Sequence, residues 1–184
     1  MPDQVFTAGQ ILTASQVTAL QNNAPSFIGQ YAMSGGVITV DNAFTSTFTN
    51  YLIVGSGLVA SASVDLYAQF RYAGPTTQSA SYYQGLGGIN YLGSASTALG
   101  GNNAAAFNLG NITTAGPQKG FNMMVIQTNA NAAITVSTWD STNGAFYSGA
   151  GYVNQSRTYT GIVFSTSSGT ITAGNIRVYG LRQS

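Results

Sequence analysis

Residues 158–182 read TYTGIVFSTSSGTITAGNIRVYGLR, a stretch with two β-rich runs separated by turn residues. The apolar residues of the two runs are Ile162, Val163 and Phe164, followed by Ile176, Val178 and Leu181. Residues 165–169 have turn composition, and Gly174-Asn175 is a second turn signal before the last run. A strong strand at the end of a chain usually ties that end into a sheet. We therefore expect the C-terminal strand to be structural, with Tyr179 on the face opposite to that of Val178.

Outward from this stretch, the same strand pattern continues back to Phe27. Runs rich in β-branched and aromatic residues are bounded by Gly, Asn or Ser clusters. Strands are predicted at 28–33, 37–40, 51–58, 64–72, 104–109, 121–128 and 133–140. Roughly ten short strands, many turn residues and almost no helix indicate an all-β fold, an antiparallel β-sandwich.

Three segments carry more detailed expectations about burial. The alternation in 64–72 is typical of a strand with one buried side, because successive side chains point to opposite faces. One face would hold Val64, Leu66, Phe70 and Tyr72, and the other Asp65, Tyr67, Gln69 and Arg71. Residues 121–126 have few polar breaks and predict a strand buried at the centre of a sheet, with Met123 and Met124 as core filling. Trp139 is also expected in the core.

Glycine marks the turns and the least regular part of the chain. A hairpin is predicted over 134–153, because Asn143-Gly144 suits a tight turn with positive φ. Residues 73–103 are rich in Gly, Ser and Ala and are predicted to be mainly a long loop, with short strands at Tyr82-Tyr83 and 90–92. The glycine clusters within 55–57 and 85–88 are interpreted as turns or bulges, since no helix follows as a phosphate-binding loop requires.

Charged residues are scarce, which excludes several classes of function. The complete set is Asp3, Asp41, Asp65, Asp140, Lys119, Arg71, Arg157, Arg177 and Arg182. So few cations give no basic patch for nucleic acid and no polybasic membrane-surface site. No run approaches the ~20 apolar residues that a membrane span needs, and the N-terminus lacks the pattern of a secretory signal. We expect no nucleic-acid partner and no membrane insertion.

The residue types that usually carry catalysis are also missing. The chain has no histidine, cysteine or glutamate, so the commonest metal ligands and general bases are absent. Asp65 and Asp140 are the two carboxylates in strand-rich sequence, and a glycosidase would need such a pair on either side of one bond. However, Asp140 begins a turn, where aspartate is favoured, and Asp65 falls on a polar face. We expect a protein that is not an enzyme and that binds no metal or cofactor.

Three blocks of sequence resemble short bacteriophage virion surface proteins. Residues 174–182 (GNIRVYGLR), after a Ser/Thr/Gly turn, resemble the closing strand of tail-fibre and head-decoration proteins. The runs YLIVGSGL at 51–58 and VDLYAQFR at 64–71 are similar to their paired early strands. Residues 6–17 (FTAGQILTASQV) resemble a leader on phage tail and neck components. The resemblance implies a jelly-roll-like sandwich, a homotrimer, synthesis in the host cytoplasm and a place in the virion.

The N-terminal residues predict a short helix in a leader. Thr13 and Gln16 form a capping box, Leu12 and Val17 occupy the positions of a hydrophobic staple, and Pro25 stops continuation. A helix of about 14–21 is too short to persist without packing on something. The residues that would anchor it are Phe6, Ile11, Leu12, Val17 and Leu20. They either dock onto another virion protein of the tail, neck or capsid, or onto symmetry mates, or they cap the chain's own core.

Aromatic residues beside loop-like segments are the candidates for contact with a receptor or partner. They are Tyr82, Tyr83, Tyr91, Phe146, Tyr147 and Tyr152. Such rings stack on sugars or anchor a protein partner, and the alternative is that each packs its loop against the sheet or lies at a subunit contact.

These observations predict residues 1–26 as a virion-anchoring leader and 27–184 as a β-sandwich head. The leading hypothesis is a non-enzymatic tail-fibre or receptor-binding component whose aromatic loops contact host surface glycan. The alternative is a capsid decoration or head-fibre protein that clamps capsid subunits, which the lack of a shaft repeat favours. A third hypothesis is a carbohydrate-binding module or hydrolase of cellular origin, which would keep its function without the leader.

Overall fold

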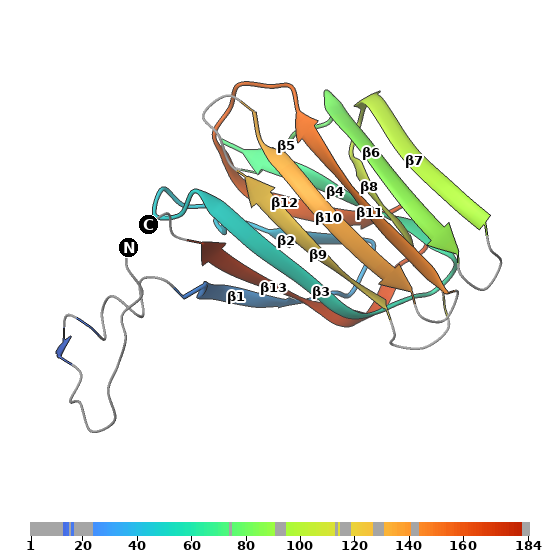
Figure 1. Cartoon of the computed structure of the whole chain (residues 1–184), viewed down its shortest axis with the longest axis horizontal. Helices are drawn as coiled ribbons and strands as arrows, with labels where there is room; N and C mark the ends of the chain where they lie inside the picture. The colour runs from blue at the N-terminus through green and yellow to red at the C-terminus, as the bar shows by residue number, and fades with distance from the viewer. Residues whose placement is uncertain are drawn as a thin grey trace.

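A computed structural model describes residues 24–181 apart from 74, 91–94, 113, 115–118, 127–130 and 141–143, together with residues 13, 14 and 16. Within these residues the chain forms thirteen β-strands (Figure 1). They are β1 (Ser26–Ala32), β2 (Val37–Val40), β3 (Asn50–Ala60), β4 (Val64–Tyr72), β5 (Thr76–Thr77), β6 (Tyr82–Asn90), β7 (Ala95–Ala104), β8 (Phe107–Ile112), β9 (Lys119–Ile126), β10 (Ala133–Asp140), β11 (Ala145–Val153), β12 (Tyr159–Thr166) and β13 (Ile171–Leu181).

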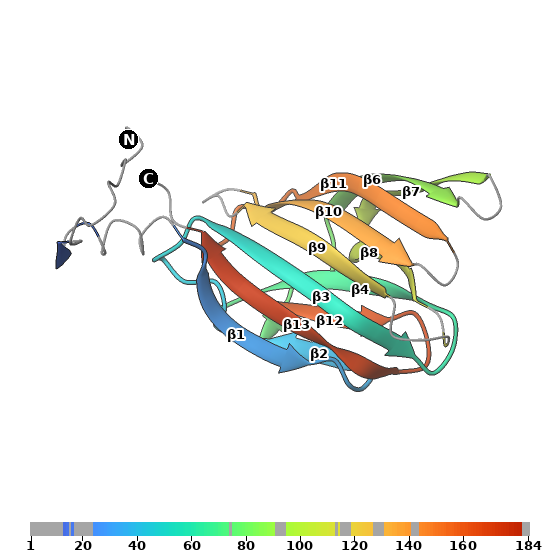
Figure 2. The ribbon, with the colours of Figure 1, turned by 60° about the horizontal axis from the view of Figure 1, so that its bottom comes forward.

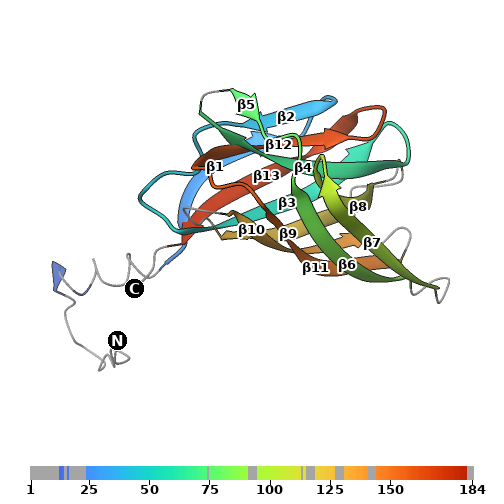
Figure 3. The ribbon, with the colours of Figure 1, turned by 90° about the horizontal axis from the view of Figure 1, so that it is seen from above.

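The strands form two antiparallel sheets packed face to face (Figures 2 and 3). The eight-stranded sheet has the order β1-β13-β3-β9-β10-β11-β6-β7, and the five-stranded sheet has the order β2-β12-β4-β5, with β8 also paired to β4. The chain crosses between the sheets repeatedly, as in jelly-roll-like sandwiches. The prediction of an all-β antiparallel sandwich is confirmed. The last strand, β13, lies between β1 and β3, so it is structural, as expected.

Aromatic side chains join the two sheets in the core. The rings of Phe121 on β9 and Phe164 on β12 are 5.6 Å apart between centroids. Tyr82 on β6 meets Phe107 on β8 edge to face at 4.7 Å. Each ring is fully buried, so the core is closed by contacts between residues that are distant in sequence.

The predicted boundaries of three strands, β2, β4 and β10, are the observed ones. The hairpin predicted over 134–153 is also present, with β10 paired to β11 and Gly144 at a φ of 62°. On β4 the alternation of buried and half-buried side chains holds as far as Phe70. Arg71, predicted on the polar face, is instead buried, and its guanidinium Nε lies 2.6 Å from Asp41 Oδ1.

The long loop predicted over 73–103 is wrong. Most of this segment forms β6 and β7, which pair with each other from Gln84–Gly101 to Asn90–Ala95 without a break in register. Gly85, Gly87 and Gly88 lie inside regular β6 rather than in turns, and Gly88 leaves room for the ring of Tyr147. Gly57, in contrast, has a φ of 65° at a bulge between β3 and β13, as expected. The prediction failed because the glycines of β6 are residues typical of turns and loops.

Two residues predicted in the core lie elsewhere. The strand β9 is central in its sheet, as expected, but it is buried on one face only. Met123 is fully buried, whereas Met124 is 38% exposed on the opposite face. Trp139 is half-buried on that same face, with its ring over Gly120. Burial therefore follows the strict alternation of side chains in β-strands.

Few of the leader residues are described. Ala14 and Gln16 are helical, and the capping box is formed: Thr13 N–H donates to Gln16 Oε1 at 2.9 Å, and Gln16 N–H to Thr13 Oγ1 at 3.3 Å. The predicted anchoring residues Phe6, Ile11, Leu12, Val17 and Leu20 lie outside the described residues. No helix in the described part of the chain has the length and apolar character to cross a membrane.

The Tyr82 hydroxyl provides a test of the core. It accepts a hydrogen bond from Phe70 N–H at 2.7 Å and donates to the Gln78 carbonyl at 3.0 Å. Tyr82→Phe leaves the buried Phe70 N–H without this acceptor, so we expect a loss of about 1–3 kcal/mol in the free energy of unfolding, measured by chemical denaturation. Tyr152→Phe, at a 43% exposed position, is the control and should change it little. Equal effects would contradict this role of the Tyr82 hydroxyl.

Candidate functional site

The face of the eight-stranded sheet that points away from the five-stranded sheet, here called the outer face, is the candidate site. Strand register sets its side chains in rows across the sheet. The row through its middle, here called the central row, runs Phe27, Tyr179, Leu52, Met124, Thr135, Ala150, Gly85 and Gly100, from β1 to β7. These residues are neighbours although they come from eight different strands.

The central row changes character between β9 and β10. On β1, β13, β3 and β9, here called the bulky half, it holds Phe27, Tyr179, Leu52 and Met124. On β10, β11, β6 and β7, here called the small half, it holds Thr135, Ala150, Gly85 and Gly100. Along the central row the outer face is therefore raised on the bulky half and low on the small half, whereas the rows nearer the strand ends place Ile89, Phe146 and Tyr152 on the small half.

Exposed large apolar side chains are concentrated on the outer face. Among the described residues these are Phe27, Val37, Ile89, Met124, Ile126, Phe146 and Tyr152. All of them except Val37, on β2, belong to the eight-stranded sheet. Large exposed apolar patches on soluble proteins mark contact surfaces.

The outer face carries almost no charge. Arg177 on β13 is the one charged residue there among the described residues, and its Nε donates to Gln30 Oε1 on the edge strand β1 at 3.0 Å. A partner could cover the central strands without removing an ionised group from water, which is the costly step in burying polar surfaces.

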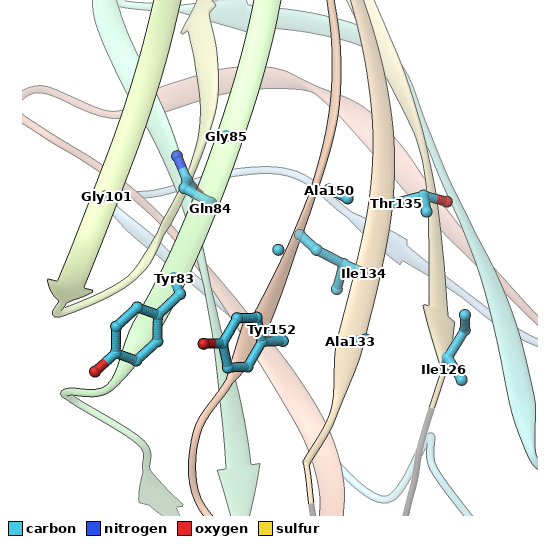
Figure 4. A pocket seen from close by; sticks show the side chains of 11 residues that line it. Tyr83, Gln84, Gly85, Gly101, Ile126, Ala133, Ile134, Thr135, Ala150 and Tyr152 are labelled. Atoms are coloured by element: carbon cyan, nitrogen blue, oxygen red, sulfur yellow. The ribbon is translucent and has the colours of Figure 1, made fainter.

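An open groove of about 560 Å³ lies on the small half (Figure 4). Its lining includes Tyr83, Gly85, Ile126, Thr135, Ala150 and Tyr152. Tyr83 of β6 and Tyr152 of β11 pair across the strands, and their rings stack with centroids 5.1 Å apart and planes 12° apart. Figure 4 shows these rings side by side at one end of the groove.

A second hollow, of about 330 Å³, lies where the two halves meet. Leu52 and Met124 of the bulky half line it, together with Asn122, Thr135, Ser137 and Ser148. Ser137 and Ser148 contact each other through their hydroxyls at 3.3 Å. The hollow is therefore uncharged, with apolar and hydroxyl groups in its lining.

The aromatic residues predicted as contact sites fall into different places. Tyr82 is fully buried, so its predicted contact with a receptor or partner is wrong, because alternation turns it inward and Tyr83 outward. Phe146 and Tyr152 are 44% and 43% exposed on the outer face. Tyr147 packs against the core, and Tyr91 lies outside the described residues. The described members lie in the strands β6 and β11 rather than in the loops predicted for them.

The two carboxylates considered for catalysis do not converge. Asp65 is on β4 of the five-stranded sheet, within 3.5 Å of the Asn111 amide. Asp140 ends β10 of the other sheet, where its carboxylate lies 3.0 Å from Lys119 Nζ, and both residues are at least 96% buried. The prediction that Asp140 only begins a turn therefore missed a buried ion pair. Burial lowers the pKa of Lys119, while Asp140 opposes that shift. The described residues contain no cluster of three or more possible Asp, Glu, His or Cys metal ligands.

Comparisons with models of protein families and with curated protein sequences found no match. Among solved structures, the chain is similar to scytalido-glutamic peptidase with a transition state analog inhibitor, at 16% identity and a TM-score of 0.30, over 82% of this chain and 64% of that chain. It is also similar to the CBM2 module of the evolved Dit of Lactobacillus casei BL23 phage J-1, at 11% identity and a TM-score of 0.23, over 80% and 70%. The chain thus spans less than two thirds of the peptidase.

The expectation that the chain is not an enzyme is contradicted by the first of these matches, since the matched protein is a peptidase. The expectation was drawn from missing residue types, and composition does not establish whether a fold hosts catalysis. The likeness concerns the fold alone, and no activity is carried over from it. This chain contains no glutamate.

The ion pair of Lys119 and Asp140 predicts an asymmetric response to mutation. Asp140→Asn leaves the buried ammonium without its carboxylate, so we expect a loss of about 3–5 kcal/mol in the free energy of unfolding. The double variant Lys119→Met/Asp140→Leu removes both charges and should lie within about 1 kcal/mol of the native chain or above it. Thermal or urea unfolding measures both. A double variant as unstable as Asp140→Asn would contradict the expectation.

Proposed function

We propose that this chain is a bacteriophage virion surface protein, attached through its N-terminal segment 1–26, that works by covering protein surface with its outer face. The observation that carries the proposal is the concentration of exposed apolar side chains on an outer face whose central strands direct no charged side chain outward. The resemblance of residues 51–58, 64–71 and 174–182 to tail-fibre and head-decoration proteins, and of residues 6–17 to a leader on phage tail and neck components, supports the same interpretation.

Within this class, the geometry favours a role in assembly at the tail or the capsid. The adhesion hypothesis relied on aromatic loops, and the described aromatic residues instead lie in the strands of a broad sheet. A broad, uncharged and partly apolar face suits a lasting protein contact, because interface cores are depleted of charge. Such a protein would be made in the host cytoplasm and would leave in the virion.

Incorporation into particles tests the proposal. Met124→Lys places a charge in the middle of the outer face, so we expect at least about tenfold less of this variant on purified particles, measured by mass spectrometry. Val37→Lys, on β2 of the other sheet, is the matched control and should be incorporated normally. Deletion of 1–26 should abolish incorporation. Immunogold electron microscopy of the native protein locates it on head or tail, and its absence from particles contradicts the proposal.

The groove beside Tyr83 and Tyr152 favours a second candidate function, host attachment through a surface glycan. Tyrosine rings offer an apolar face for the C–H groups of a sugar and a hydroxyl for hydrogen bonding. The volume of about 560 Å³ is within the range of small-molecule sites. The lack of charge in its lining suits a neutral saccharide.

Binding to purified host surface polysaccharide tests this second candidate. Tyr152→Ala removes one of the two stacked rings, so we expect at least about tenfold weaker binding by calorimetry. Tyr67→Ala, on β4 of the five-stranded sheet, is the control and should bind like the native chain. Native binding that Tyr152→Ala leaves unchanged, or no native binding, would contradict glycan recognition at this groove.

A further inference from the structure

We infer that the partner of the outer face is a second copy of this chain, related by a two-fold axis that runs parallel to the strands between β9 and β10. The inference rests on the proposed function, because it names the occupant of the same surface. In a two-fold interface, residue i of one chain contacts residue j of the other, and j contacts i. A face suits such pairing when its two halves have complementary shapes.

The outer face meets this condition along its central row. Rotation about the axis exchanges β1 with β7, β13 with β6, β3 with β11 and β9 with β10, since these strands lie at equal distances from it. The pairs that then face each other across the interface are Phe27 with Gly100, Tyr179 with Gly85, Leu52 with Ala150, and Met124 with Thr135. Each large side chain of the bulky half meets a small residue of the small half.

The neighbouring rows follow the same rule in part, since the axis also sets Leu181 of β13 opposite Tyr83 of β6, and both of these residues are large. On one side of the central row, Ile126 would face Ala133, and Asn50 would face the hydroxyl-bearing ring of Tyr152. On the other side of the central row lies the row that contains Asn122 and Ser137, and in it the axis sets Val54 opposite Ser148. Large opposite small is the arrangement by which packed layers interdigitate without voids. The groove on the small half and the hollow where the two halves meet provide space that side chains of the bulky half would fill.

The charge distribution agrees with this partner. Arg177 is the one described charge on the outer face, and the axis sets it opposite Gly87, near the margin of the sheet. No described charge therefore meets a like charge, and none is buried at the centre. Two sheets of this twist pack face to face with their strands within about 30° of each other, as the axis requires.

An exchange of one large and one small residue tests the inference. Leu52 and Ala150 are separated by two strands in one chain, or ~14 Å at ~4.8 Å per strand, so they do not touch within a monomer. Leu52→Ala removes the large side chain from this contact between the two chains, and Ala150→Leu fills the space that the large side chain would occupy. Each should weaken the dimer at least about tenfold in Kd, measured with the full chain by sedimentation equilibrium. The double variant restores the volume at both symmetric contacts and should return to within about threefold of the native Kd.

Val37→Ala is the matched control for an exposed apolar residue outside this face, and it should leave the Kd unchanged. The inference is overturned by a native chain that remains a monomer up to ~1 mM. It is equally overturned by a homotrimer, or by a double variant as weak as the weaker single one.

A second pair keeps the test decisive if Leu52→Ala disturbs the fold. Val54→Lys and Ser148→Asp introduce opposite charges at two partly or fully exposed positions that would face each other. Mixed in equal amounts, the two variants should form a heterodimer at least about tenfold tighter than either homodimer. Equal affinities of the heterodimer and the two homodimers would refute the proposed position of the two-fold axis. A monomeric chain that still enters particles refutes this inference alone, whereas a dimer absent from particles refutes the proposed function alone.

Discussion

The packing of the five-stranded sheet against one face of the eight-stranded sheet is the interaction on which the rest of the structure depends. Rings such as Phe121 and Phe164 close this contact, and the inner sides of β3, β9 and β10 are buried by it. The same alternation that fills the core sends every second side chain to the outer face. A sheet covered on one side only therefore presents Leu52, Met124 and Ile126 in one surface.

Apart from Arg177 on β13, the charged side chains of the described residues lie away from that surface. Lys119 and Asp140 pair inside the sandwich, and Arg71 and Asp41 pair beside the five-stranded sheet. Arg157 lies over the ring of Tyr72, 4.1 Å from its centroid. What remains on the central strands of the outer face is apolar, hydroxyl or amide. Covering such a surface costs little desolvation free energy, because no ionised group leaves water. The low charge of the chain is therefore consistent with a role in protein–protein contact.

Sequence alone predicted the strands whose pattern is carried by β-branched and aromatic residues, such as β4 and β10. It missed β6 and β7 because small residues carry no periodicity. Gly149 and Gly151, for example, are needed where the backbone of β6 passes close to β11. Adjacent like residues misled the reading of burial: Tyr82 and Tyr83, like Met123 and Met124, point to opposite faces. Asp140 meets Lys119 because the register between β9 and β10 places them side by side, and local sequence does not specify that register.

The candidate site could not be predicted from the sequence either, because it too depends on strand register. The central row takes one residue from each of eight strands, and its order follows from topology rather than from spacing along the chain. The aromatic residues singled out by sequence included Tyr83, Phe146 and Tyr152, which do lie on the outer face. The sequence showed which residue types were available for contact, and the strand order showed how they combine into a central row that is bulky on four strands and small on the other four.

Oxidation of methionine by peroxide, followed by mass spectrometry, tests most directly whether the outer face is covered in the assembled state. Met124 is 38% exposed on this face, while Met33 and Met123 are fully buried and serve as internal references. The account predicts that Met124 oxidises readily in the dilute monomeric chain and at least about tenfold more slowly in the assembled protein on particles. Equal rates of Met124 oxidation in the two states would contradict it.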